Sequence, residues 1–287
     1  MTDPTVFRQY TRAELDAEYD NRAKVSESAV HIAWYTERSV ATRAHLGFAL
    51  DLSYGESHEE TLDLFGVAGG GHKPVHIFFH GGYWRAMHKD DFSFVADGLA
   101  PHGALIAVVN YTLIPTVDMA RLIDECRRSV LWLYHNVSAY GGDPDQMYVS
   151  GHSAGGHIAA MMMATDFAAL DANVSNDIVK GACGISGLYD LEPIRQCFLN
   201  EVLGLDDVAV ASFSPVLLEK HGNGPVELIH GDAEGDEFAR QSNDLANVWD
   251  NTRAKPMAPF DHFSIMRELA RDDSELTGQI VSMMGLD

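Results

Sequence analysis

Short apolar runs alternate with helical patterns along most of this chain. The runs at residues 75–79 and 104–110 are rich in β-branched or aromatic side chains and have the length of buried strands, and residues 181–185 are a further strand candidate. Helical periodicity separates them, most clearly over residues 119–140, where a glycine pair ends the pattern. Further strands are predicted at 147–150 and 225–229, and further helices at 91–99, 158–167 and 236–249. Strands alternating with helices predict an α/β fold, with a mostly parallel sheet covered by helices on both faces.

The first 60 residues have a different pattern. Thr11 and Glu14 form a capping-box signature, and Leu15 and Tyr19 then fall four residues apart on one helical face. A second helical stretch is expected over residues 30–50, followed by an edge strand from Asp51 onward. No linker or internal repeat divides the chain, so we expect one domain over residues 1–287. Residues 1–60 are then a helical extension, which we expect to cover the active site.

Charge and composition exclude several classes of partner. The chain has 42 acidic and 20 basic residues and a formal charge of -22, which disfavours nucleic acid and anionic membranes. No apolar stretch reaches membrane-spanning length and the N-terminus lacks the pattern of a secretory signal, so we expect a cytoplasmic protein.

Metal and cofactor signatures are missing from the sequence. Cys126, Cys183 and Cys197 are odd in number and widely spaced, which fits reduced buried thiols better than disulfides or a zinc site. An HExxH pattern at His58 fails because Leu62 stands at the second histidine position, and no phosphate-binding glycine motif occurs. We therefore expect neither a metal nor a cofactor.

A candidate nucleophile lies between a predicted strand and a predicted helix. The segment Gly-His-Ser-Ala-Gly-Gly-His places Ser153 at the turn that lifts a serine hydroxyl out of a sheet edge. Glycines on either side permit the tight turn and close approach of neighbouring backbone. A glycine turn without chemistry is the alternative, and a second motif argues against it.

That second motif is His-Gly-Gly-Tyr-Trp, at the end of the first clear apolar strand. Acyl transfer needs donors directed at a developing oxyanion, and backbone N–H groups in a glycine turn supply them without reorganisation. We predict an oxyanion hole formed by the amides of Gly82 and Tyr83 with that of Ala154, the residue after the nucleophile.

The general base and its carboxylate follow from chain order. Serine hydrolases built on such a sheet carry the triad in the order Ser, acid, His, and only His262 among the 14 histidines suits the last place. The segment after the strand at 225–229 offers three carboxylates. We favour Glu234, with Asp232 and Asp236 as alternatives, of which Asp236 could instead cap the next helix.

With these motifs, the chain resembles the kynurenine formamidase (arylformamidase) branch of the α/β-hydrolases, near the hormone-sensitive-lipase-like esterases. The segments HGGYW, GHSAGGH, VNYTLIP, GDAEGDEFARQS and YDNR carry the resemblance, which spans about residues 10 to 270. It implies an α/β-hydrolase fold, and by position the family's acid falls on Glu234, where Asp is commoner. Pro256 and Pro259 precede His262, so we expect a short or irregular last strand.

The resemblance implies a serine hydrolase that cleaves an N-formyl or small-acyl arylamide, with N-formylkynurenine as the expected substrate. Trp84 and Tyr111, beside strand ends, are candidates for an aromatic-binding pocket. A carboxylesterase for short acyl or aryl esters would use the same residues, and a catalytically silent binding module is a third reading. We expect a small-molecule partner, and the sequence leaves a homodimer open.

Overall fold

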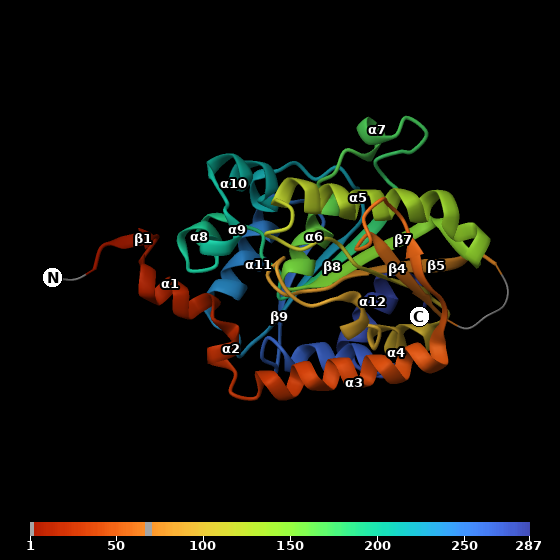
Figure 1. The fold of residues 1–287 in the computed structure, drawn as a ribbon, viewed down its shortest axis with the longest axis horizontal. Coiled ribbons are helices and arrows are strands. Elements are labelled where there is room, and N and C mark those ends of the chain that lie inside the picture. The colour runs from red at the N-terminus through yellow and green to blue at the C-terminus, as the bar shows by residue number, and fades with distance from the viewer. Residues whose placement is uncertain (1–2, 67–70) are drawn as a thin grey trace.

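The computed structural model describes residues 3–66 and 71–287, and its centre is an eight-stranded sheet (Figure 1). The strands lie in the order β10-β9-β8-β7-β5-β6-β4-β3. The six from β5 to β10 run parallel, whereas β4 pairs antiparallel with β6 and β3 pairs antiparallel with β4. Their bounds are β3 Gly47–Ser53, β4 Thr61–Phe65, β5 Lys73–Phe79, β6 Leu105–Val109, β7 Gly142–His152, β8 Val179–Ile185, β9 Val226–Gly231 and β10 Thr252–Met257. The expected α/β fold with a mostly parallel sheet is confirmed.

Helices cover both faces of this sheet. One face carries α3 (Ser28–Leu46), α4 (Val95–Leu99) and α12 (Glu275–Met283), whose apolar side chains belong to one core cluster. The opposite face carries α5 (Met119–Asn136), α6 (Ala154–Met163) and α11 (Asp236–Val248), which pack into the second cluster. In Figure 1, α3 runs along the bottom of the molecule and α5 along the top. Both sides of the parallel strands are therefore buried, as their continuous apolar sequences require.

The remaining elements are short. The helices among them are α1 (Arg12–Tyr19), α2 (Asn21–Lys24), α7 (Phe167–Leu170), α8 (Glu192–Gln196), α9 (Asn200–Leu203) and α10 (Asp207–Phe213). Five 3₁₀ turns are η1 (Lys89–Asp91), η2 (Ala100–His102), η3 (Val137–Tyr140), η4 (Pro215–Leu217) and η5 (Ser264–Ala270), and β1 (Thr5–Phe7) pairs with β2 (Tyr10–Thr11). None of the helices in the described ranges is both long and apolar enough to cross a membrane.

Several predicted boundaries differ from the observed ones. The second N-terminal helix ends at Leu46, so β3 begins before Asp51, and the helix expected over 91–99 is divided into η1 and α4. The helix expected from residue 158 starts at Ala154, directly after Ser153. The expectation of an irregular last strand was wrong, because β10 pairs with β9 over six consecutive residues. It lies at the edge of the sheet, where a strand tolerates a residue without an N–H group such as Pro256.

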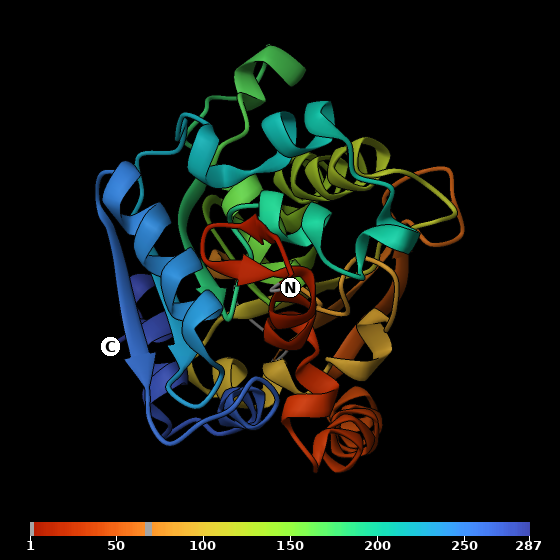
Figure 2. The same cartoon turned by 90° about the vertical axis from the view of Figure 1, so that its left-hand side faces the viewer.

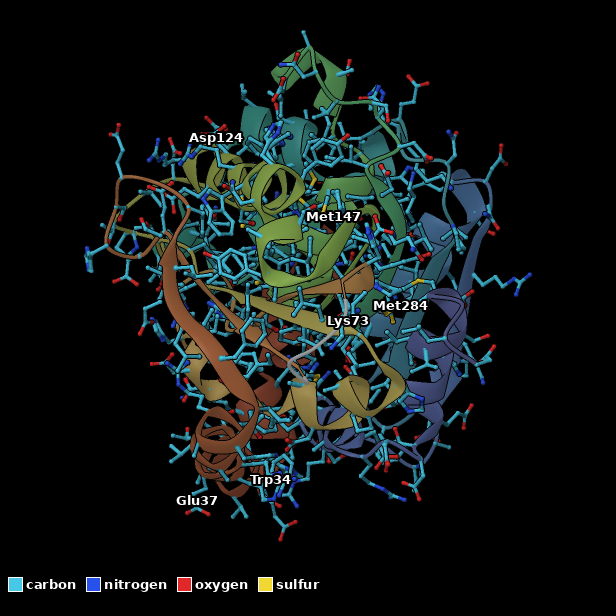
Figure 3. All side chains as sticks on the ribbon, turned by 90° about the vertical axis from the view of Figure 1, so that its right-hand side faces the viewer. Trp34, Glu37, Lys73, Asp124, Met147 and Met284 are labelled. Carbon is cyan, nitrogen blue, oxygen red and sulfur yellow. The ribbon has the colours of Figure 1, made fainter. Side chains whose placement is uncertain are left out.

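The N-terminal segment lies at one end of the sheet. α1 starts with the predicted capping box between Thr11 and Glu14, and Leu15 and Tyr19 are buried. Figure 2 shows α1 and α2 in front of the sheet, facing the viewer. Figure 3 shows the opposite end of the molecule, where the label Lys73 marks the amino-terminal end of β5. The N-terminal segment thus lies near the carboxyl ends of the parallel strands, where α/β sheets position their sites.

Candidate active site

Ser153 occupies a sharp turn between β7 and α6. Its backbone has φ 57° and ψ -117°, a conformation that is costly for any residue with a Cβ atom. The turn is held by a hydrogen bond in which the Ser153 N–H donates to the Ile185 carbonyl at 2.8 Å. A side chain at Gly155 would collide with the carbonyl oxygen of Phe79 in β5. The glycine therefore lets α6 begin directly against the sheet, with Ser153 at its amino end.

Glu234 and His262 form a buried hydrogen-bonded pair. Oε2 of Glu234 lies 2.7 Å from Nδ1 of His262, and both side chains are almost fully buried. The other carboxylate oxygen, Oε1, accepts hydrogen bonds from the hydroxyl of Ser186 and the N–H of Gly231, both at 2.5 Å. Because the carboxylate accepts a hydrogen bond from Nδ1–H, it favours the tautomer in which Nε2 carries no proton and can take one from a nucleophile.

The alternative acids lie elsewhere. Asp232 and Asp236 are both exposed, and among the described residues neither contacts His262. Asp236 does not cap α11 either, since the cap residue is Gly235 and the first turn has no side-chain cap. Of the three carboxylates in this segment, the structure brings only Glu234 to the histidine.

The loop after β5 holds three consecutive residues with left-handed backbone. φ is 112° at Gly82, 49° at Tyr83 and 58° at Trp84. A Cβ atom at Gly82 would also collide with the carbonyl oxygen of Ala86, so only glycine fits there. Within residues 3–66 and 71–287, the amides of Gly82, Tyr83 and Ala154 have no hydrogen-bond acceptor. Unpaired amides near a candidate nucleophile are available to an oxyanion.

Side chains from distant elements hold this loop in place. The Tyr83 hydroxyl donates to the carbonyl of Tyr19 at 2.8 Å and accepts from Nδ2 of Asn21 at 3.1 Å. The Trp84 indole donates to Nδ1 of His157 at 3.2 Å. Burial lowers the pKa of His157 to about 4, so its ring stays neutral and can accept that bond.

A cavity of about 430 Å³ lies beside the candidate catalytic residues. Ser153, His262, Gly82 and Tyr83 all line it, so the nucleophile and base candidates, over a hundred residues apart in sequence, face one space. The remaining wall comes from the N-terminal segment and from the region of α8 and α9, through Tyr19, Asp20, Asn21, Arg22, Ile32, Arg85, Ala86, Met87, Ile114, Pro115, His152, Phe198, Leu199, Val202 and Phe263.

His152 is a second histidine in the cavity wall. Its Nε2 donates to the backbone carbonyl of His262 at 2.8 Å, and the two rings lie 4.6 Å apart. Burial, with a smaller contribution from His262, holds the pKa of His152 well below its usual range. A neutral His152 therefore supports the base loop without adding a charge beside it.

The predicted aromatic pocket residues were wrong. Trp84 and Tyr111 are fully buried and do not line the cavity. Tyr111 stacks on His80 at 4.3 Å and donates its hydroxyl to the His80 carbonyl at 2.7 Å, so it belongs to the core beneath the loop. The aromatic residues that do line the cavity are Tyr19, Tyr83, Phe198 and Phe263. Tyr83 belongs to the predicted oxyanion motif, whereas the tertiary structure alone identifies the other three as lining residues.

One carboxylate cluster has the spacing of a metal site. Asp51, Asp63 and Asp90 have oxygen atoms within 4.8 Å of one another. Nζ of Lys89 already lies between them, at 2.6, 2.9 and 3.0 Å, and Arg43 pairs with Asp63 as well. These two cations balance most of the charge of the three carboxylates, and the cluster joins β3 and β4 to η1.

The cysteines are isolated from this chemistry. Cys126, Cys183 and Cys197 are free and buried, as expected from their spacing. Burial raises the pKa of each thiol, that of Cys197 to about 11, so none is an activated nucleophile.

Comparison with known proteins gives consistent results. The BD-FAE family model matches residues 62–248. The kynurenine formamidase of Danio rerio is 32% identical over 97% of this chain and 98% of its own length, and that of Salmo salar is 30% identical over 89% and 88%. A solved structure from Silicibacter sp. tm1040, assigned as a thioesterase, is 29% identical and superposes with a TM-score of 0.81 over 92% of this chain and 98% of that one.

Proposed function

Because this chain belongs to the kynurenine formamidase family of α/β-hydrolases, we propose that it hydrolyses N-formyl arylamines, with N-formylkynurenine as substrate and kynurenine and formate as products. One observation carries the catalytic part of the proposal. His262, whose Nδ1 lies 2.7 Å from Oε2 of Glu234, lines the same cavity as Ser153. This shared cavity supports the assignment of Ser153 as the nucleophile and His262 as its base.

In the proposed mechanism, Nε2 of His262 takes the proton of the Ser153 hydroxyl while Oγ of Ser153 attacks the formyl carbon. The amides of Gly82, Tyr83 and Ala154 donate to the resulting oxyanion. His262 then protonates the amine nitrogen and the C–N bond breaks, leaving formyl-serine. Water, deprotonated by His262, releases formate and restores the hydroxyl. Glu234 stabilises the imidazolium formed in both steps.

The cavity supports a compact substrate. Its volume of about 430 Å³ lies near the lower end of the range for small-molecule sites. Four aromatic residues, Tyr19, Tyr83, Phe198 and Phe263, line it, which suits a ligand with one aromatic ring.

A substrate panel tests the proposal. Turnover of N-formylkynurenine is compared with that of p-nitrophenyl acetate and a p-nitrophenyl butyrate control, and labelling by a fluorophosphonate probe is measured in parallel. We expect formamide turnover and labelling, both lost in Ser153→Ala. Strong ester turnover without formamide turnover would instead identify a carboxylesterase, and absence of labelling would identify a silent hydrolase fold.

A further inference from the structure

Two arginines in the cavity wall have no anionic partner. Arg22 and Arg85 line the cavity, yet among the residues that the structure describes no carboxylate lies within ion-pair distance of either guanidinium. Neither side chain donates a hydrogen bond to another described residue. Most other arginines form ion pairs, namely Arg8, Arg12, Arg38, Arg43, Arg121, Arg128, Arg195, Arg240 and Arg271.

Arg127, Arg253 and Arg267 also lack a carboxylate partner among the described residues, but none of these three lines the cavity. With 42 acidic and 20 basic residues, an arginine has many potential partners. Arg85 is only partly exposed, so part of the hydration of its guanidinium is lost without compensation from the protein. A planar guanidinium forms two parallel hydrogen bonds to a carboxylate, which makes it well suited to recover that loss from a ligand.

The backbone of Arg85 belongs to the turn that carries the candidate oxyanion amides. Its backbone N–H donates to the Gly82 carbonyl at 3.1 Å, so it belongs to the same turn as the amides of Gly82 and Tyr83. A ligand held by the Arg85 side chain and by these amides would be fixed at two points. Fixing a substrate at a second point orients its reacting bond.

A carboxylate of the protein also lines this cavity. Asp20 caps α2 through Oδ1, which accepts from the Ala23 N–H at 3.1 Å, and no cation among the described residues pairs with it. The cavity therefore contains an unpaired anion as well as two unpaired cations. An α-amino acid group, with its ammonium and carboxylate, has complementary charges.

We propose that Arg85, with Arg22 at the exposed rim, binds a carboxylate of the substrate, so that the enzyme selects formyl arylamines that carry a free α-amino acid group. This inference rests on the proposed function, whose substrate contains such a group. It assigns the discrimination between that substrate and neutral formamides or esters to one side chain.

Binding to the Ser153→Ala protein separates recognition from turnover. N-formylkynurenine and its α-carboxamide, which differ at the carboxylate alone, are titrated by calorimetry. We expect the carboxylate ligand to bind about tenfold or more tightly, as a charge-assisted pair implies. Adding Arg85→Gln should reduce this ratio to about two or less, and Arg85→Lys should retain part of it.

The matched control is Arg253→Gln in the same background. Arg253 is an exposed arginine on β10 that does not line the cavity, so its replacement should leave the ratio unchanged. Equal affinities in the Ser153→Ala protein, binding of neither ligand, or an Arg85→Gln protein that keeps the preference would each overturn the inference. Turnover by the unmodified enzyme is measured separately. If it fails on N-formylkynurenine while the binding preference holds, the proposed function is wrong and the carboxylate site remains.

Discussion

Both oxygens of Glu234 are engaged, and this makes an amide replacement informative. Oε1 accepts from the Gly231 N–H and the Ser186 hydroxyl, whereas Oε2 faces Nδ1 of His262. In Glu234→Gln, the Gly231 N–H still requires an acceptor, so the amide oxygen faces Gly231 and the NH₂ group faces His262. Nδ1 must then accept a hydrogen bond, which favours a proton on Nε2, the wrong tautomer for a base.

We therefore expect Glu234→Gln to lower kcat by about 10³-fold or more, as in other triads with the wrong histidine tautomer. Steady-state kinetics with N-formylkynurenine measure this. Asp236→Asn is the control, since Asp236 is exposed and should tolerate the same change within about twofold. A large loss in the control with little effect at Glu234 would reassign the acid.

At the scale of elements, the segment from Tyr19 to Lys24 connects two parts of the site. Asn21 and the Tyr19 carbonyl hold the Tyr83 hydroxyl, while Nζ of Lys24 donates to the Glu234 carbonyl at 3.3 Å. The Tyr19 hydroxyl donates in turn to Glu237 of α11 at 2.7 Å. This short segment therefore contacts both the loop with the candidate oxyanion amides and the turn with the candidate acid.

Removing one of these contacts should affect the rate more than substrate affinity. We expect Asn21→Ala to lower kcat by about three- to tenfold, the value of one neutral hydrogen bond, because Tyr83 loses part of its anchor. KM should change by less than about twofold. The control is Asn136→Ala, which removes an exposed amide whose one side-chain bond within residues 3–66 and 71–287 is to the Trp132 carbonyl of its own helix. An unchanged kcat in Asn21→Ala would show that the loop holds its conformation alone.

At the scale of the whole molecule, buried neutral histidines link folding to pH. Burial lowers the pKa of His76 to about 3 and that of His80 and His157 to about 4. In the unfolded chain these groups titrate near pH 6.5, so between about pH 6.5 and 4 the unfolded state binds more protons than the folded state. Stability therefore falls as the pH falls through this window.

His76→Leu should reduce the acid loss of stability. Nε2 of His76 lies 2.7 Å from the Ser150 hydroxyl, and neither residue lines the cavity. We expect the decrease in unfolding free energy between pH 6.5 and 4 to become smaller by about 3 kcal/mol, whatever the change at neutral pH. Urea denaturation at a series of pH values measures it. The control is His58→Leu, at an exposed position. If the unfolding free energy depended on pH equally in both variants and in the unmodified protein, the prediction would be contradicted.

The sequence alone determined the strands and the chain order of the site, because both depend on local constraints. Apolar runs of strand length predicted β5 to β9, and the glycine turns around Ser153 and Gly82 follow from backbone sterics within a few residues. β4 was missed because Asp63 interrupts its apolar pattern, and the partners of this buried carboxylate, Arg43 and Lys89, lie 20 and 26 residues away.

Only the tertiary structure decided which side chains meet. The sequence favoured Glu234 but left Asp232 and Asp236 as alternatives, and burial beside His262 distinguishes Glu234 from both. Trp84 and Tyr111 pack into the core, whereas Phe198 and the N-terminal residues Tyr19 to Arg22 form the cavity wall. The physical reason is that the direction of a loop side chain depends on contacts with segments far along the chain, and no local pattern encodes them.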